Sequence, residues 1–201
     1  MKKVLLIGCG GHAKSVIDVI ENISSLSIFG LIGKKNEIGS KIFGYSVIGN
    51  DDSLKDLRKI VSNAFICVGK IGVDYRRTEI LKLLESLDFK FPTIISKYAV
   101  VSKFATIGEG TFIGHSAIVN ADSKIGNHCI INTKSVIEHE SIIGDNCHIS
   151  TGSIINGNVK IGQNSFIGSN SMIRENLYLP ENSIISAGKR VMGWPINLKD
   201  K

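Results

Sequence analysis

A histidine flanked by two acidic residues, Glu138-His139-Glu140, is the strongest candidate for acid–base chemistry in this sequence. An imidazole titrates near neutral pH, and a neighbouring carboxylate can orient the ring and keep it basic enough to take a proton from an amine or a hydroxyl. We therefore expect His139 to be a catalytic base. The alternative is a solvated surface histidine without a chemical role.

A glycine-rich turn near the start, Gly8-Cys9-Gly10-Gly11-His12-Ala13, is the second candidate. It lies between an apolar run and a segment of helical spacing, so its backbone N–H groups and the helix N-terminus favour an anion such as phosphate. A purely structural tight turn is the alternative. NAD binding is disfavoured, because Ala13 replaces the third glycine of the fingerprint and Gly33-Lys34-Lys35 lacks the acid that holds an adenosine ribose.

Composition narrows the class of ligand and the location. The net charge is +6, and the basic residues lie mainly in the first part, scattered and without interleaved aromatic residues, which favours a phosphate-bearing ligand over nucleic acid. Glycines interrupt the first apolar run too early for a signal peptide or a membrane span, so we expect a cytoplasmic protein without a membrane partner. The four cysteines lack C-x-x-C spacing, so we expect no metal site. We expect their side chains to be small buried groups: Cys9, Cys67, Cys129 and Cys147.

The elements that must position these residues fall into two parts with different periods. Residues 1–94 alternate between apolar runs and helical spacing, which predicts a small parallel sheet with helices on its faces, a Rossmann-like α/β domain. The predicted strands are residues 4–7, 27–32 and 64–68, and the predicted helices are residues 12–21, 53–61 and 75–87.

Residues 95–201 follow a six-residue repeat instead. Every sixth position from Ile95 to Val191 is aliphatic, and a small side chain usually follows four residues later, as a solenoid with six-residue sides requires. These hexads resemble those of left-handed β-helix acyltransferases, in which three hexads form one triangular coil. The resemblance implies an α/β N-terminal Rossmann-like domain followed by a left-handed parallel β-helix.

An 18-residue coil predicts which residues stack on one another. His139 should lie between Ala121 and Gly157, whose small size leaves room beside the ring for a substrate. His148 lies half a coil away, so one chain cannot easily use both histidines. A symmetric trimer could bring His139 of one subunit toward His148 of another, and we expect a homotrimer with sites at its interfaces. We expect the two other histidines of this part to be solvated: His115 and His128.

Taken together, these motifs resemble the bacterial family of sialic acid O-acetyltransferases and nucleotide-aminosugar N-acetyltransferases over nearly the whole chain. The most specific segments are residues 10–12, 131–133, 137–140, 148–150 and 156–162. The resemblance implies that acetyl-CoA lies along the β-helix between adjacent subunits, and that the first domain holds the sugar-nucleotide.

The resemblance also assigns roles to individual residues. It implies that His139 is the general base, that Glu140 orients it, and that His148 contacts the acetyl carbonyl or the pantetheine. The residues implied in the CoA groove are Gly157, Ser169 and Ala187. Those implied in sugar-nucleotide binding are Gly10, Gly11, His12 and Gly69.

We expect acetyl transfer from acetyl-CoA to the amine of a nucleotide-linked amino-deoxysugar used in a surface glycan. O-acetylation of a sialic or related nonulosonic acid is the nearest alternative, since Lys34 and Lys35 would suit a free carboxylate. A catalytically silent sugar-nucleotide-binding accessory protein is the alternative from another class. Two departures from the family pattern concern the ligands: Gly33-Lys34-Lys35 replaces an acidic pair after the second strand, and Gly193-Trp194-Pro195-Ile196 replaces Gly-x-Pro-Ala.

Overall fold

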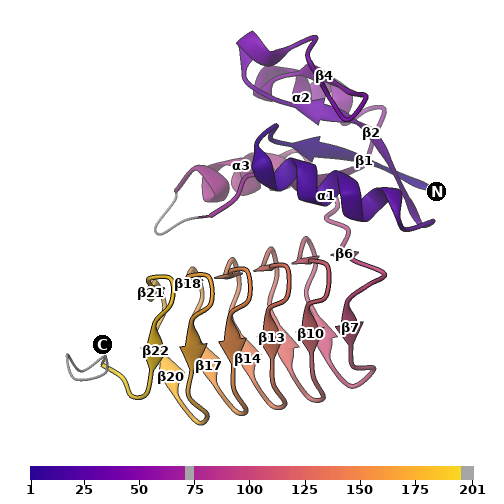
Figure 1. Cartoon of the computed structure of the whole chain (residues 1–201). Coiled ribbons are helices and arrows are strands. Elements are labelled where there is room, and N and C mark those ends of the chain that lie inside the picture. Colours follow the sequence, from indigo (N-terminus) through magenta and orange to yellow (C-terminus); the bar gives the residue numbers. More distant parts are fainter. Residues whose placement is uncertain (71–74, 196–201) are drawn as a thin grey trace. The chain divides into compact units, whose positions relative to one another are not determined.

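The computed structural model describes residues 1–70 and 75–195 (Figure 1). Contacts between residues divide the chain into two compact units, with the boundary between Ile94 and Ile95. The sequence changes period at the same point, because a solenoid packs only against its own neighbouring coils. Ile196 of the C-terminal motif lies outside the described residues.

The N-terminal unit is built on a five-stranded sheet with the order β3-β4-β2-β1-β5. All pairs are parallel except the hairpin of β3 and β4. The strands are β1 (Lys2–Ile7), β2 (Leu26–Ile32), β3 (Lys41–Ile42), β4 (Tyr45–Gly49) and β5 (Asn63–Ile66). The helices are α1 (Gly11–Glu21), η1 (Lys35–Glu37), η2 (Asp51–Ser53), α2 (Leu54–Leu57) and α3 (Tyr75–Ser86).

Helix α1 covers the sheet through the residues whose spacing predicted it. Val16, Ile17, Val19 and Ile20 are buried, while the polar residues between them face outward, as an amphipathic helix requires. One prediction for this unit is wrong in detail, since the helix expected over residues 53–61 is only a short 3-10 and α segment. The hairpin of β3 and β4 was not predicted; β3 has only two residues and therefore no readable alternation.

The C-terminal unit consists of three parallel sheets of two-residue strands, the arrangement of a left-handed β-helix, and this confirms the predicted fold. The sheet orders are β21-β18-β15-β12-β9-β6 (sheet C), β22-β19-β16-β13-β10-β7 (sheet D) and β20-β17-β14-β11-β8 (sheet E). Each strand residue pairs with the strand residue 18 positions away, as Val136 does with Ile118 and Ile154. The 18-residue coil is therefore the repeating unit.

The strand bounds in chain order are as follows. The strands of the first nine hexads are β6 (Ile94–Ile95), β7 (Val100–Val101), β8 (Thr106–Ile107), β9 (Phe112–Ile113), β10 (Ile118–Val119), β11 (Lys124–Ile125), β12 (Ile130–Ile131), β13 (Val136–Ile137) and β14 (Ile142–Ile143). The remaining strands are β15 (His148–Ile149), β16 (Ile154–Ile155), β17 (Lys160–Ile161), β18 (Phe166–Ile167), β19 (Met172–Ile173), β20 (Tyr178–Leu179), β21 (Ile184–Ile185) and β22 (Arg190–Val191).

The aliphatic residue of each hexad points into the β-helix. From Ile113 to Val191 these residues are all buried, and Ile95, Val101 and Ile107 pack against them at the first coils. Cys129 and Cys147 are buried at the predicted stacking positions, whereas Cys9 is only half-buried, contrary to the prediction. The corners of the coils depend on a residue with positive φ at every sixth position, which explains why asparagine, aspartate and glycine recur there.

Candidate active site

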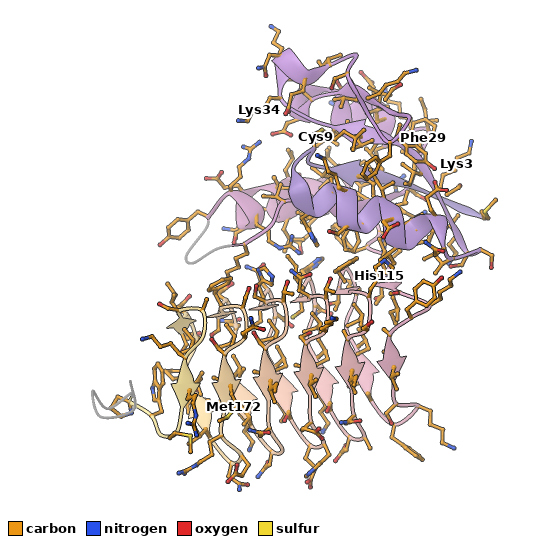
Figure 2. The ribbon with its side chains drawn as sticks, in the orientation of Figure 1. Lys3, Cys9, Phe29, Lys34, His115 and Met172 are labelled. Atoms are coloured by element: carbon orange, nitrogen blue, oxygen red, sulfur yellow. The ribbon has the colours of Figure 1, made fainter. Side chains whose placement is uncertain are left out.

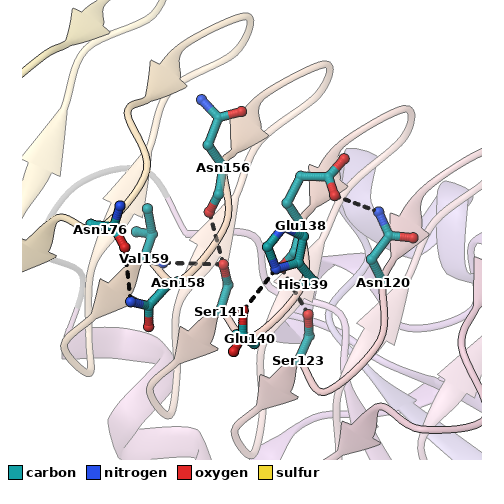
Figure 3. A network of polar contacts seen from close by, with 10 residues as sticks. All are labelled: Asn120, Ser123, Glu138, His139, Glu140, Ser141, Asn156, Asn158, Val159 and Asn176. Carbon is teal, nitrogen blue, oxygen red and sulfur yellow. Dashed lines mark hydrogen bonds and ion pairs between the residues drawn. The ribbon is translucent and has the colours of Figure 1, made fainter.

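His139 and Glu140 form the corner between β13 and β14 (Figure 3). Glu140 occupies the positive-φ position of the corner, with φ +62. This sharp reversal brings the two adjacent side chains together, and His139 Nδ1 lies 2.9 Å from Glu140 Oε2. Both side chains are well exposed, at 61% and 59%, so the pair faces a space that a substrate can enter.

The contact with Glu140 determines which nitrogen of the neutral His139 ring carries the proton. An ionised carboxylate only accepts hydrogen bonds, so His139 Nδ1 carries the proton and donates it to Glu140 Oε2. In the neutral ring the lone pair is then on Nε2. An imidazole in this tautomer can take a proton at Nε2 while the carboxylate stabilises the charge that develops.

The position of the ring depends on Gly157, one coil further on. A Cβ atom built on Gly157 would lie 2.8 Å from His139 Cε1 and 2.9 Å from Nε2. Any side chain at this position would therefore have to displace the imidazole. The structure thus places Gly157 against the ring, where the 18-residue rule expects it, and the space that the glycine leaves is already used by the histidine.

Hydrogen bonds from both neighbouring coils hold the corner in place. Glu140 N donates to Ala121 O at 3.1 Å, and Asn158 N donates to His139 O at 2.9 Å. The Glu138 side chain points away from His139, and its Oε2 accepts from Asn120 Nδ2 at 2.9 Å (Figure 3). Only Glu140 of the two flanking acids therefore orients the imidazole.

His148 lies in a different sheet from the His139 corner. It belongs to β15 in sheet C, is 7% exposed, and contacts the edge of Phe166 with ring centroids 5.3 Å apart. Its Nε2 lies 3.3 Å from Asn132 Nδ2. The Asn132 amide is oriented by Thr133 N, which donates to Oδ1 at 2.8 Å, so Nδ2 is the atom that donates to His148. The sequence did not indicate this role for Asn132.

The residues predicted to line the CoA groove lie at two different corners. Gly157 lies between β16 and β17, where sheet D meets sheet E, together with His139. Ser169 and Ala187 lie one coil apart where sheet C meets sheet D. Ser169 Oγ is 2.9 Å from Ser150 Oγ. Within one chain, sheet D separates these two groups of residues.

Comparison with known proteins now identifies the family. Residues 3–84 match the PglD N-terminal domain, and residues 104–139, 122–157 and 140–175 match the bacterial transferase hexapeptide (six repeats). The chain thus joins a PglD-like N-terminal domain to hexapeptide repeats of the bacterial transferase type. The predicted family is confirmed.

Solved structures are similar to this chain over almost its full length. A histidine mutant of perosamine N-acetyltransferase from Caulobacter crescentus, in complex with CoA and GDP-perosamine, is 28% identical with a TM-score of 0.88, covering 96% of this chain and 89% of that chain. The acetyltransferase domain of PglB from Neisseria gonorrhoeae FA1090 is 26% identical with a TM-score of 0.85, covering 96% of this chain and 92% of that chain.

Two curated relatives share a shorter segment. The UDP-N-acetylbacillosamine N-acetyltransferase of Bacillus subtilis (strain 168) is 31% identical over 115 residues, which are 56% of this chain and 51% of the relative. The uncharacterized protein L142 of Acanthamoeba polyphaga mimivirus is 33% identical over 119 residues, which are 59% of this chain and 22% of the relative. The matched segment thus spans about half or less of these relatives.

The glycine turn of the N-terminal unit begins α1. Gly10 is the N-cap and Gly11 is the first helical residue. Apart from the adjacent residues and the backbone of α1 itself, no heavy atom of the described residues lies within 4 Å of a Cβ built on either glycine. Packing within the chain therefore does not require glycine at these positions, and a ligand can approach the backbone. Gly69 lies beside His12, since its Cβ would be 3.8 Å from His12 Cβ. The structure thus brings the predicted sugar-nucleotide residues together.

Cys9 lies in the middle of this turn and is labelled in Figure 2. Burial, and to a lesser extent the nearby Glu37 carboxylate, raise the pKa of the Cys9 thiol to about 11. The thiol is therefore protonated at neutral pH, and only the thiolate is reactive. Cys9 instead lines a cavity of about 430 Å³ together with Lys14, Glu37, Lys41 and Phe43, residues that the sequence did not single out.

The prediction that the two remaining histidines of the β-helix are solvated is wrong. His128 is 6% exposed, and His115 Nδ1 lies 2.6 Å from Ser96 Oγ. In the described parts of the chain, no cluster of three or more His, Cys, Asp and Glu residues could hold a metal ion. Among the same residues, every helix is too short or too polar to cross a bilayer.

Proposed function

We propose that this acetyltransferase moves the acetyl group of acetyl-CoA to the amine of a nucleotide-linked amino-deoxysugar during surface glycan biosynthesis. The observation that carries this proposal is the His139–Glu140 pair on a hexapeptide-repeat corner, with Nε2 oriented as a proton acceptor. The relatives support the amine as acceptor, since perosamine and UDP-N-acetylbacillosamine N-acetyltransferases both act on amino sugars. We place the reaction in the cytoplasm, where the free cysteines stay reduced.

The reaction needs no covalent intermediate on the protein. The amine nitrogen attacks the thioester carbonyl carbon and forms the C–N bond, while His139 Nε2 takes the proton that the nitrogen loses. The tetrahedral oxyanion then collapses and breaks the C–S bond, and the proton held by His139 neutralises the departing CoA thiolate. Glu140 stabilises the imidazolium between these steps. His148, held by Asn132, contacts the acetyl carbonyl or the pantetheine in this proposal.

A homotrimer would complete this site. The outward row of sheet D is apolar over its first five strands, in contrast to the more polar row of sheet E. It comprises Val100, Ile118, Val136, Ile154 and Met172, and it ends at Arg190. Val100 and Ile154 are exposed in the single chain. Because this row lies between the two corners, a second copy seated on it would bring Ser169 and Ala187 of one subunit to His139 of another.

The trimer can be tested by sedimentation of charged variants. Ile154→Glu places a carboxylate in the apolar row and should dissociate the assembly and abolish acetyl transfer. Lys160→Glu, on the outward row of sheet E, is the matched control and should leave both unchanged. A monomeric wild-type protein with full activity would refute the shared site.

The function itself is tested by CoA release. The purified chain is incubated with acetyl-CoA and each member of a panel of UDP- and GDP-linked amino-deoxysugars, with nonulosonic acids as a separate arm. We expect release of CoA and a mass-detected N-acetyl product with an amino sugar, and neither in His139→Ala. Acetylation of a nonulosonic acid alone would replace the proposal by O-acetylation, and no acetylation in any arm would refute it.

A further inference from the structure

The first coil of the β-helix carries the same short motif at two successive corners. Ser-Lys-Tyr-Ala at residues 96–99 precedes β7, and Ser-Lys-Phe-Ala at residues 102–105 follows it. In each motif the backbone N–H of the aromatic residue donates to the serine Oγ, at 3.0 Å in the first and 3.2 Å in the second. In both, the lysine Nζ lies 4.9 Å from the centroid of the aromatic ring. The motif itself therefore sets the position of its lysine.

Packing within the chain does not explain the aromatic residues of the two motifs. Tyr98 is 57% exposed and Phe104 is 67% exposed. One coil further on, the same positions hold Ser116 and Asp122, polar residues with positive φ, and the outer face of a terminal coil is expected to be polar as well. What both rings contact is the ammonium group beside them, which an aromatic face attracts. We therefore interpret each ring as the group that holds its lysine in place.

Each lysine begins a column of residues, spaced 18 apart at one corner of the β-helix, that carries part of the acetyl-transfer site. The column that begins at Lys103 continues with Ala121, His139 and Gly157. The column that begins at Lys97 continues with His115, Thr133, Thr151, Ser169 and Ala187. Lys103 is thus two coils from His139 on the same corner, about 10 Å at the ordinary strand spacing. The proposed homotrimer would bring the two columns, and with them the two lysines, together.

The direction of the columns separates the two substrates. The residues expected in the CoA groove lie on the C-terminal side of His139: Gly157, Ser169 and Ala187. The acceptor cannot occupy the same space, so it has to reach His139 from the other side, past Ala121 and the first coil. A nucleotide-linked amino sugar carries an anionic diphosphate. Two coils correspond to the length of a pyranose ring that bears the amine at one end and a phosphate at the other.

We propose that Lys103 of one subunit and Lys97 of its neighbour bind the diphosphate of the acceptor while its amine lies at His139. An ammonium group offers three donors and a compact charge, which suits phosphate oxygens. Phe104 and Tyr98 are positioning residues, since they hold the two ammonium groups at the corners. Because the distance from lysine to His139 is fixed by the coils, the arrangement favours an amine at the far end of the sugar ring from the diphosphate. This inference rests on the acceptor and the homotrimer of the proposed function.

The test is steady-state CoA release by the full chain with the nucleotide amino sugar that reacts best in the acceptor panel. Lys103→Met and Lys97→Met should each raise KM for this acceptor roughly tenfold or more, since a charge-assisted hydrogen bond is lost. KM for acetyl-CoA should not change. KM for the acceptor should also depend less on ionic strength in both variants than in the wild type. Lys103→Arg should retain most of the affinity. Lys124→Met, an exposed lysine in β11 of sheet E, is the control and should match the wild type.

Phe104→Leu separates the positioning role from a role in folding. The variant keeps an apolar side chain but loses the aromatic face, so KM for the acceptor should rise about two- to fivefold at an unchanged melting temperature. A lower melting temperature of the lysine variants with unchanged KM would make the motifs caps of the first coil and overturn this inference. A raised KM for acetyl-CoA alone would assign the lysines to the phosphates of CoA and overturn it too. An effect of Lys103→Met without one of Lys97→Met would overturn the contribution of the neighbouring subunit. Acetyl transfer to no nucleotide amino sugar would instead overturn the proposed function.

Discussion

Two histidines of the β-helix lie against a glycine one coil away, and their surroundings differ. A Cβ on Gly157 would collide with His139, and a Cβ on Gly110 would lie 2.3 Å from His128 Nδ1. His139 is exposed and paired with Glu140, whereas His128 is buried. The comparison shows that a glycine 18 residues away indicates room for an imidazole, and that exposure and a carboxylate partner distinguish a candidate base from a packed side chain.

Removing each imidazole should separate chemistry from packing, and this is the largest effect that we predict. His139→Ala should lower kcat by roughly 10²- to 10⁴-fold, the usual contribution of a positioned acid or base, without a change in folding. His128→Ala should leave kcat within a few-fold of wild type and destabilise the β-helix by about 1–3 kcal/mol, because a buried side chain is lost. CoA release and thermal melting measure the two effects. Retained activity in His139→Ala would remove its assigned role.

The aliphatic residues that point into the β-helix support both histidine positions, and shortening one of them should affect stability only. Ile143 is buried in β14, directly after the His139 corner. Ile143→Ala should destabilise the protein by roughly 2–5 kcal/mol through a cavity in the stack, as measured by denaturant unfolding. The activity of the folded fraction at low temperature should remain near that of wild type. A loss as large as that of His139→Ala would mean that the corner does not hold its geometry independently.

The two glycines should respond in opposite ways to a methyl group. Gly157→Ala forces the exposed His139 ring to move, so acetyl transfer should fall about tenfold or more while the melting temperature stays nearly unchanged; Gly157→Leu should abolish transfer. Gly110 has φ +63 and faces a buried ring, so Gly110→Ala should cost about 1–3 kcal/mol of stability with little effect on kcat. Equal unfolding by Gly157→Ala and Gly110→Ala would show that both glycines are structural.

The smallest effect concerns the carboxylate that distinguishes the two histidines. Glu140→Gln keeps an acceptor for His139 Nδ1–H but removes the charge that stabilises the imidazolium, so kcat should fall about tenfold with little change in KM. Steady-state kinetics of CoA release provide the measurement. Glu138→Gln is the control, because its side chain contacts Asn120 and not His139. Equal losses in both variants would point to a general charge effect.

The regular half of the chain could be predicted in detail from its sequence. The six-residue period identifies the inward residue of each hexad, and the 18-residue coil then identifies the neighbours of every other residue. The contact of His139 with Gly157 follows from this arithmetic. The burial of His128 does not, because the same period applies to every corner and says nothing about what covers it.

The sequence by itself determined the six-residue repeat and the adjacency of His139 and Glu140, because local periodicity and chain order encode them. The resemblance to the β-helix acyltransferases added the coil of three hexads. Only the tertiary structure decided that Glu37 fills the space beside Gly33 and that Phe43 lines the same cavity. These relations join residues through turns and sheet edges whose geometry no repeat specifies. The physical reason is that a repeat specifies only which residues stack along the axis of the β-helix, whereas a binding site brings together residues from several strands, helices and turns.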